Sequence, residues 1–515
     1  MRNFNKLLKN KYLLGLVGIL LVGLIVRLFV FGAVTVGHSQ DSYWFITLGE
    51  NFINNFRIEL SANQPYDLSQ PLHPMLLGIT SLFFNDLYFN GKLFSLIIGL
   101  LVIPATYFFW RRLENRKTAL FATFFVAFAA LSLKYSVAIR EDSLYTLLLI
   151  LSLFFIYRIK EDFRKMPIAA MFITLASLSR WEGYLLIPTV FISLIYWNRK
   201  SIFKKNGLDL RIFSNKYFLL SVIIVFIPLF FWSLRSFNLC DCGMKGFIPS
   251  YSYQQQLSGS GGGAGISYLT GIFSLIHWYF LIFIIIGILS SFSKFKKFFP
   301  IYLYLAFSLF IHMAFRGNPE QVVYILPLLY GFLGFLIVDF GKRLSNKKIK
   351  MFHIIVLIFM SLFLYVNISE GYSETREWGT RNEVIESAME WVNENVDPSE
   401  KILVGDVLVY SYFTENELVS MSSASYWMNS YSQQNPHEDP LVPYVVFLYS
   451  NGVNYAVAYD STMSWFYGRT ENFAKNFGQR AYNFEEGVLV LTPIKEFKDN
   501  GESLILYEIQ VNGGS

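Results

Sequence analysis

An aspartate, Asp41, stands a few residues beyond the first long apolar run of the sequence, in the stretch TVGHSQDSYWFITLGENF (residues 35–52). Three of its near neighbours, Tyr43, Trp44 and Phe45, are aromatic. A carboxylate in this place can be a solvated helix cap, favoured by the helix dipole, or a base held at the membrane surface. The aromatic surroundings favour the second interpretation.

Other ionisable residues interrupt the apolar segments, and the order of those segments puts them on the same side as Asp41. Charged residues near membrane depth are costly and often mark function. Singly, each has a simpler interpretation: an acid that starts a helix, a private ion pair closing a helical hairpin, or an interfacial anchor. The set comprises Arg140, Glu141 and Asp142 in YSVAIREDSLY, Arg180 and Glu182 in SLSRWEGYLLIP, Arg316 in FRGNPEQVVYILPLL, and His73 between two prolines.

Carboxylates and arginines at one membrane face suit the transfer of a sugar from a lipid phosphate. That reaction needs a base to take the acceptor's proton and a cation to stabilise the departing phosphate. A guanidinium can hold a phosphate with two hydrogen bonds, so we expect at least one of Arg316, Arg180 and Arg140 to bind it. A lipid-linked donor lies at headgroup depth, and the position of Asp41 after the first apolar run meets that condition.

The elements that must position these residues are membrane helices. The chain has 515 residues, of which 54% are hydrophobic, and its apolar residues form long blocks. Since a transmembrane helix needs about 20 apolar residues, the sequence predicts eleven spans. They lie near 12–34, 90–110, 118–135, 142–158, 166–179, 184–197, 217–234, 268–290, 298–315, 321–339 and 350–368. The shorter segment 71–84 is expected to be interfacial or re-entrant, and the first span is expected to be a retained anchor.

Basic residues predict the orientation. Five loops carry 22 Lys and Arg against four acids, namely 111–117, 158–165, 199–216, 294–297 and 342–350. With eleven spans these loops share one side with the N-terminus, which we therefore expect in the cytoplasm of a multi-pass plasma-membrane protein. The net charge of +6 is thus mostly a topology signal, and it gives no indication of a nucleic-acid partner.

The last part of the chain has a different composition. Residues 369–515 hold 22 acids and eight bases and no membrane-length apolar segment. RNEVIESAMEWVNENV has helical spacing, whereas KILVGD, VNYAVAYD, GVLVLTPI and LILYEIQV resemble strands. The sequence therefore predicts a polytopic all-α membrane domain over 1–370, with a large first outer loop at 35–70, and an extracytoplasmic α/β domain over 371–515.

The order of these landmarks resembles the C-type glycosyltransferases, in the branch of the dolichyl-phosphate-mannose–protein mannosyltransferases and aminoarabinose transferases. The resemblance covers about residues 1–370. It is carried by the acid after the first span in QDSYWF, the interfacial QPLHPMLLG, the helix start REDSLYTLLLILSLFFIYR, the turn SRWEGYLLIP and the late VVYILPLLYGFLG.

The resemblance implies a fold of about eleven transmembrane helices and transfer, with inversion, of a hexose or pentose from a polyprenyl phosphate, either dolichyl or undecaprenyl. The acceptor would be a hydroxyl of a protein, glycan or lipid. Asp41 would be the catalytic base and Asp142 a second site acid, with Glu141, His73, Glu182 and Tyr43 contacting substrate. A divalent cation (Mg or Mn) on Asp41 and Asp142 stays open, since Ser42 stands where many relatives have a second acid and one carboxylate binds such an ion poorly.

Two other classes stay open. A secondary transporter or flippase would have a similar number of helices, but usually shows an internal repeat, and the sequence shows none. A scaffold presenting the C-terminal domain would leave Asp41 and Asp142 without a role.

Overall fold

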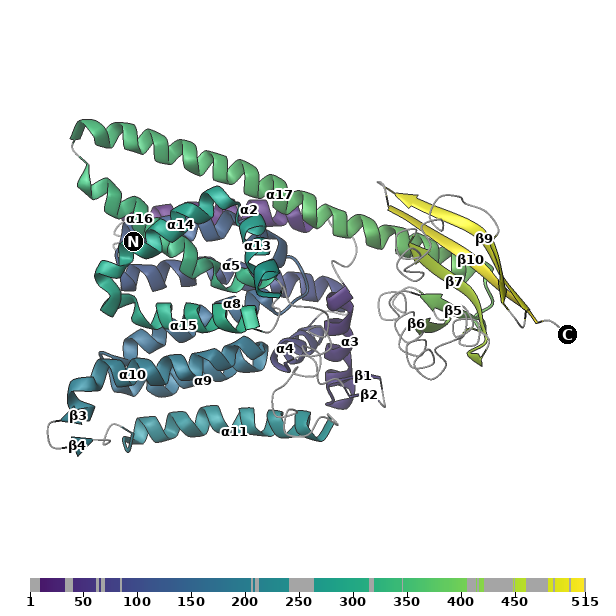
Figure 1. The fold of residues 1–515 in the computed structure, drawn as a ribbon, viewed down its shortest axis with the longest axis horizontal. Helices are drawn as coiled ribbons and strands as arrows, with labels where there is room; N and C mark the ends of the chain where they lie inside the picture. The colour runs from purple at the N-terminus through teal and green to yellow at the C-terminus, as the bar shows by residue number, and fades with distance from the viewer. Residues whose placement is uncertain are drawn as a thin grey trace. The chain divides into compact units, whose positions relative to one another are not determined.

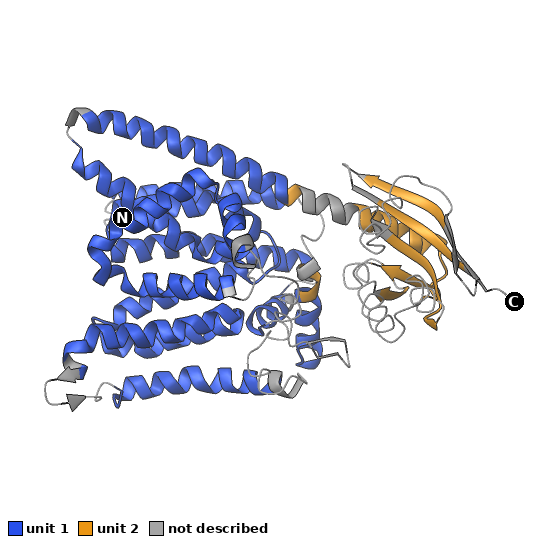
Figure 2. Ribbon diagram, in the orientation of Figure 1, with its two compact units in different colours: residues 1–32, 45–374 blue, residues 33–44, 375–515 orange. Residues whose placement is uncertain are grey.

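The structure is a computed structural model that divides the chain into two compact units (Figure 2), the first formed by residues 1–32 and 45–374 and the second by residues 33–44 and 375–515. Within these units it describes residues 10–32, 40–61, 64–65, 70–83, 86–204, 207–208, 213–239, 264–314, 319–344, 346–404, 414, 416–420, 448, 450–459, 480–484, 487–499 and 502–513.

The first unit is built from helices that pack in neighbouring pairs, among them α5 with α8, α8 with α9, α9 with α11, and α6 with α16 (Figure 1). Its helices are α2 (Lys11–Gly32), α4 (Leu72–Ser81), α5 (Leu87–Leu113), α6 (Arg116–Phe128), α7 (Ala130–Tyr135), α8 (Asp142–Ile159), α9 (Met166–Ser179), α10 (Leu186–Ile202), α11 (Lys216–Leu239), α13 (Ala264–Leu275), α14 (Trp278–Ser291), α15 (Phe295–Ala314) and α16 (Leu326–Arg343). Short turns of 3₁₀ helix join them as η1 (Phe163–Lys165), η2 (Trp181–Leu185), η4 (Phe292–Lys294) and η5 (Pro319–Ile325). Two small ribbons pair β1 (Glu59–Ser61) with β2 (Gln64–Pro65) and β3 (Phe203–Lys204) with β4 (Gly207–Leu208).

Two helices continue from one unit into the other, α3 (Gln40–Asn55) and α17 (Asn346–Asn395). With 50 residues, α17 is about 75 Å long at 1.5 Å per residue. It includes both the last expected span and the helical RNEVIESAMEWVNENV, so the expected domain boundary at 370/371 falls inside it.

Among the described residues, seven helical stretches are long and apolar enough to cross a membrane. The predicted class of polytopic helical membrane protein is confirmed, but the expected count of eleven spans is not. Three expected spans fall short of about 20 residues, because α6, α9 and α10 have 13, 14 and 17 residues. Two further expected spans merge into one stretch, Trp278–Met313. The segment expected to be interfacial or re-entrant forms α4, which has only 10 residues.

The expected span 118–135 is broken at Ala129, whose extended backbone (φ −64°, ψ 135°) separates α6 from α7. Unpaired backbone groups are costly in a membrane unless other groups bond them. Here the fully buried Arg27 donates from Nη1 to the Ala127 carbonyl at 2.7 Å, and the Ala130 N–H donates to Asn367 Oδ1 at 2.9 Å. Arg27 of α2 and Asn367 of α17 therefore provide hydrogen-bond partners for backbone groups next to the helix break.

The second unit contains a six-stranded sheet in the order β6-β5-β7-β10-β9-β8. β5 pairs in parallel with β6 and β7, and the remaining pairs are antiparallel. The four strands expected from the sequence are present as β5 (Lys401–Val404), β7 (Val453–Tyr459), β9 (Gly487–Asp499) and β10 (Glu502–Gly513), and β6 (Glu417–Ser420) and β8 (Arg480–Phe484) are additional. The predicted α/β class of this unit is confirmed.

Candidate functional site

A cluster of five charged side chains forms where α8 begins and α9 ends. We call Arg140, Glu141, Asp142, Arg180 and Glu182 the charge cluster. Asp142 is the first residue of α8, Arg180 follows the last residue of α9 in an extended conformation (φ −150°, ψ 148°), and Glu182 lies in η2. Because α8 packs against α9, the two turns meet although they are about 40 residues apart in the sequence.

Arg180 is the centre of the charge cluster. Its Nε and Nη2 donate to the two oxygens of Glu182 at 3.2 and 3.3 Å, and its Nη1 contacts Glu141 and lies 3.6 Å from Asp142 Oδ1. The simpler interpretation of Arg180 and Glu182 as a private ion pair is therefore wrong, since Arg180 joins three carboxylates. Arg140 adds a bond from Nε to Asp142 Oδ2 at 3.0 Å.

The charge cluster is shielded from solvent. The side chains of Glu182 and Asp142 are 0% and 3% exposed and that of Arg180 is 10% exposed. Burial raises the pKa of Glu141 to about 7, although the Arg180 guanidinium acts against this shift. The guanidinium of Arg180 also lies 4.6 Å from the centre of the buried Tyr324 ring, in cation–π geometry.

A second set of polar side chains links α7, η5 and α17, which the sequence analysis did not place together. Lys134 Nζ, on α7, lies 3.0 Å from Glu320 Oε1 of η5 and 2.9 Å from Glu374 Oε2 of α17. Tyr135 contacts the other oxygen of Glu320 through its hydroxyl. The partners are at least 185 residues apart in the sequence, so no local pattern could have predicted the pairing.

His73 lies on α4, fully buried, with its ring 4.6 Å from that of Phe45 and 6.0 Å from that of Phe94. Among the described residues, neither ring nitrogen has a hydrogen-bond partner. Burial lowers the pKa of His73 to about 3. The positive charges of Arg140 and Arg180 also lower this pKa, whereas the Asp142 carboxylate raises it. The imidazole is therefore neutral at physiological pH.

The remaining predicted site residues are placed differently. Asp41 lies in the first turn of α3, but its side chain is outside the described part of the structure, as is the whole of Arg316. The Tyr43 side chain is 1% exposed and belongs to the core of the second unit, with Val384, Met389, Leu504 and their neighbours. Tyr43 is thus enclosed by apolar residues.

The expected metal ligands can be compared with this geometry. In the described residues no group of three or more His, Cys, Asp or Glu side chains is arranged to hold a metal ion. Both oxygens of Asp142 face guanidinium nitrogens, of Arg140 at 3.0 Å and Arg180 at 3.6 Å. A carboxylate opposed by two cations does not fit the role of a ligand to Mg²⁺ or Mn²⁺.

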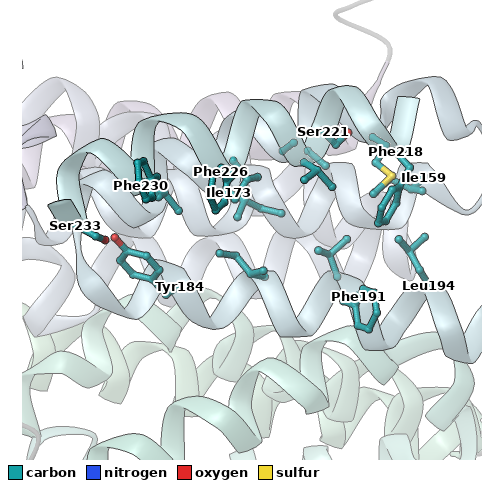
Figure 3. A pocket seen from close by; sticks show the side chains of 18 residues that line it. Ile159, Ile173, Tyr184, Phe191, Leu194, Phe218, Ser221, Phe226, Phe230 and Ser233 are labelled. Atoms are coloured by element: carbon teal, nitrogen blue, oxygen red, sulfur yellow. The ribbon is translucent and has the colours of Figure 1, made fainter. Parts of the chain in front are cut away.

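An apolar groove of about 490 Å³ lies between α9, α10 and α11 (Figure 3). Apart from Tyr184, Ser221 and Ser233, its lining side chains are all apolar. Tyr184 and Ser233 point toward one another at one end, and Ile159 and Phe218 lie at the other. Tyr184 belongs to η2, the turn that also carries Glu182, so the groove begins beside the charge cluster.

The helical membrane unit, its polar turns and the α/β unit together define the fold of the C-type glycosyltransferases, and the resemblance seen in the sequence is confirmed. Residues 64–232 match the sequence model of the family described as dolichyl-phosphate-mannose-protein mannosyltransferase. No curated protein sequence matches the chain significantly.

Solved structures share the fold at low sequence identity. The oligosaccharyltransferase of Archaeoglobus fulgidus in its apo form matches 92% of this chain and 73% of its own, at 16% identity and a TM-score of 0.62. ArnT from Cupriavidus metallidurans, bound to undecaprenyl phosphate, matches 96% of this chain and 97% of its own, at 12% identity and a TM-score of 0.57. A further structure of the Archaeoglobus enzyme, AglB, holds an inhibitory peptide and a dolichol-phosphate, with 12% identity and a TM-score of 0.56 over 90% of this chain and 72% of its own.

Proposed function

We propose that this protein is a membrane glycosyltransferase that moves a hexose or pentose from a polyprenyl phosphate to a hydroxyl of a protein, glycan or lipid. The fold carries this proposal. Two structures with the same fold hold undecaprenyl phosphate and dolichol-phosphate, and one of them also holds a peptide. The family matched by residues 64–232 is named for a dolichyl-phosphate sugar donor.

The described part of the first unit has a feature that suits such an amphiphilic donor. The apolar groove begins at Tyr184, two residues from Glu182 of the charge cluster, and continues along α9, α10 and α11 toward Ile159. The polyprenyl chain would lie in the groove, with the phosphate near the polar turns. In this groove the polyprenyl chain would contact protein side chains instead of mobile lipid tails. These fixed contacts would orient the donor headgroup.

Asp41 is the proposed base. It takes the proton of the acceptor hydroxyl as the acceptor oxygen bonds the anomeric carbon. The bond from that carbon to the phosphate oxygen breaks, and polyprenyl phosphate leaves. A single displacement of this kind inverts the anomeric configuration.

The phosphate needs a cation that is not already neutralised. Arg140 and Arg180 already face three carboxylates of the charge cluster, and the place of Arg316 in the sequence makes it the first choice. Asp142, Glu141 and Glu182 then orient the two cluster arginines and the turns that carry them. In this proposal the N-terminus is cytoplasmic and the second unit lies outside.

The test is sugar transfer by the purified chain from a defined polyprenyl-phosphate sugar, with Asp41→Asn and Glu50→Gln compared at equal protein amount. Glu50→Gln removes an exposed carboxylate from the same helix and serves as the matched control. Loss of a general base costs about 10²–10⁴-fold in rate, so Asp41→Asn should fall by that factor while the control changes less than twofold. Arg316→Ala should raise the donor KM, and Arg316→Lys should restore it only in part.

Near-normal turnover of Asp41→Asn would show that Asp41 is a helix cap. Absence of any transfer, together with movement of the lipid-linked sugar across liposomes that contain the protein, would instead support the secondary transporter or flippase.

A further inference from the structure

A second cavity lies at the opposite end of α8 from the charge cluster. It has a volume of about 360 Å³, within the range of ligand pockets. Asp142 begins α8 and Lys160 follows its last residue, so the two sites are separated by an 18-residue helix, about 27 Å long. We call this cavity the basic pocket, and the polar side chains of its lining are Arg112, Tyr157, Lys160, Glu161, Trp197, Lys296 and Lys297.

Positive charge exceeds negative charge in the lining, with four basic side chains and one acid. Arg112 pairs with Glu161, and Lys297 Nζ bonds Glu114 at 2.7 Å. Within the described residues no carboxylate pairs with Lys160 or Lys296, and both are exposed. Two ammonium groups are therefore free to face an anion.

The wall of the basic pocket adds an unsatisfied donor. The indole N–H of Trp197 is buried and has no acceptor within the described chain. A buried donor without a partner is destabilising, and a ligand with an acceptor oxygen would remove that cost. Phe109 and Phe154 also line the cavity, so the ligand needs an apolar part beside its anionic group.

The helices that form the basic pocket identify the source of such a ligand. α5 and α8 are membrane-length apolar helices, and the pocket lies where each of them ends in basic residues. That end lies at headgroup depth, where phospholipid phosphates are present at high local concentration. Basic pockets between membrane helices are suited to anionic lipid headgroups.

We propose that the basic pocket binds the headgroup of an anionic phospholipid from the leaflet that faces the basic loops. Lys160 and Lys296 bind the phosphate, Trp197 donates its N–H to a phosphate or ester oxygen, and the glycerol lies against the aromatic wall. This site is independent of the proposed transfer reaction, because the residues that form it lie a helix length away from the charge cluster.

The test uses the full chain in nanodiscs of phosphatidylcholine with increasing phosphatidylglycerol, with bound lipid counted by native mass spectrometry after gentle delipidation. A Lys160→Gln, Lys296→Gln double variant should bind phosphatidylglycerol about tenfold or more weakly, since each basic residue near a membrane surface contributes substantially to anionic-lipid binding. The matched control is Lys348→Gln, Lys350→Gln, which removes the same charge from exposed positions outside the pocket. This control should retain wild-type binding.

Trp197→Phe keeps an aromatic side chain and removes the N–H donor, so it should weaken binding severalfold in a chain that remains folded. Equal weakening by the pocket and control double variants would overturn the proposal, because it would mean that only overall charge matters. Displacement of the lipid by inorganic phosphate at equal concentration would also overturn it, by identifying a small-anion site.

Discussion

Replacing Tyr43 with alanine should weaken the second unit and also slow sugar transfer. The Tyr43 ring is 1% exposed inside the core formed with α17 and the sheet. Truncating a buried aromatic residue to alanine costs about 3–5 kcal/mol, and we expect the free energy of unfolding of this unit to fall by that amount. Tyr43 is two residues from Asp41 on α3, so the loss of its anchor also lets the backbone that carries the proposed base move. A displacement of about 1 Å can cost about 10²-fold in rate.

Two comparisons separate these effects. Leu504→Ala removes a fully buried side chain of the same core from β10 and should cost about 2–5 kcal/mol, yet leave turnover near normal where the unit is still folded. In the Asp41→Asn background, Tyr43→Ala should produce little further loss of turnover, because residues that act as one unit are not additive. Tyr43→Phe keeps the ring and should keep most of the rate. Equal rate losses in Tyr43→Ala and Leu504→Ala, or full additivity with Asp41→Asn, would refute the positioning role.

Three further predictions concern the charge cluster, the orientation and pH. Arg180→Met leaves buried carboxylates unpaired and should cost about 3–5 kcal/mol, part of which Glu182→Leu should recover; a double-mutant cycle of unfolding in lipid–detergent micelles measures this coupling, and additive effects would contradict it. A cysteine at Ser399→Cys should label from outside in intact cells and one at Ser345→Cys should not, whereas equal labelling would contradict the proposed orientation. Because burial lowers the pKa of His73 to about 3, below the value of about 6.5 in the unfolded chain, the unfolded state binds more protons between these values. Stability should therefore fall as the pH drops below about 6.5, and His73→Phe, compared by unfolding at pH 7.5 and 5, should lessen that fall.

Periodicity and composition predicted much of the fold. Long apolar blocks predicted the membrane helices, and alternation in VNYAVAYD and LILYEIQV predicted β7 and β10. The number of spans was harder to predict from the sequence, because α6, α9 and α10 are shorter than the thickness of a bilayer. Their ends are fixed by contacts such as Arg27 with the Ala127 carbonyl, which depend on the packing of distant helices.

The candidate site was predictable only in part, because the sequence shows local runs of charged residues but not how distant helices pack. Arg140, Glu141 and Asp142 form one run in the sequence, as do Arg180 and Glu182, and each run was identifiable as a polar turn. Their union into one charge cluster depends on the packing of α8 on α9. The enclosure of Tyr43 was not predictable, since an aromatic residue beside Asp41 has the same pattern whether it contacts a substrate or a domain core.

The charge balance of the cluster argues for a division of roles at the proposed site. Two arginines face three carboxylates, and burial, which raises the pKa of Glu141, reduces the negative charge of the cluster. Such a cluster has little net positive charge with which to attract a lipid phosphate, and both oxygens of Asp142 and of Glu182 face guanidinium nitrogens. The cluster instead fixes the relative position of two turns. Its five side chains hold the end of α9 against the start of α8, and Arg180 also contacts the ring of Tyr324. In our proposal the reagents are Asp41 and Arg316, and the charge cluster has a structural role, because it holds the turns at the start of α8 and the end of α9 in place.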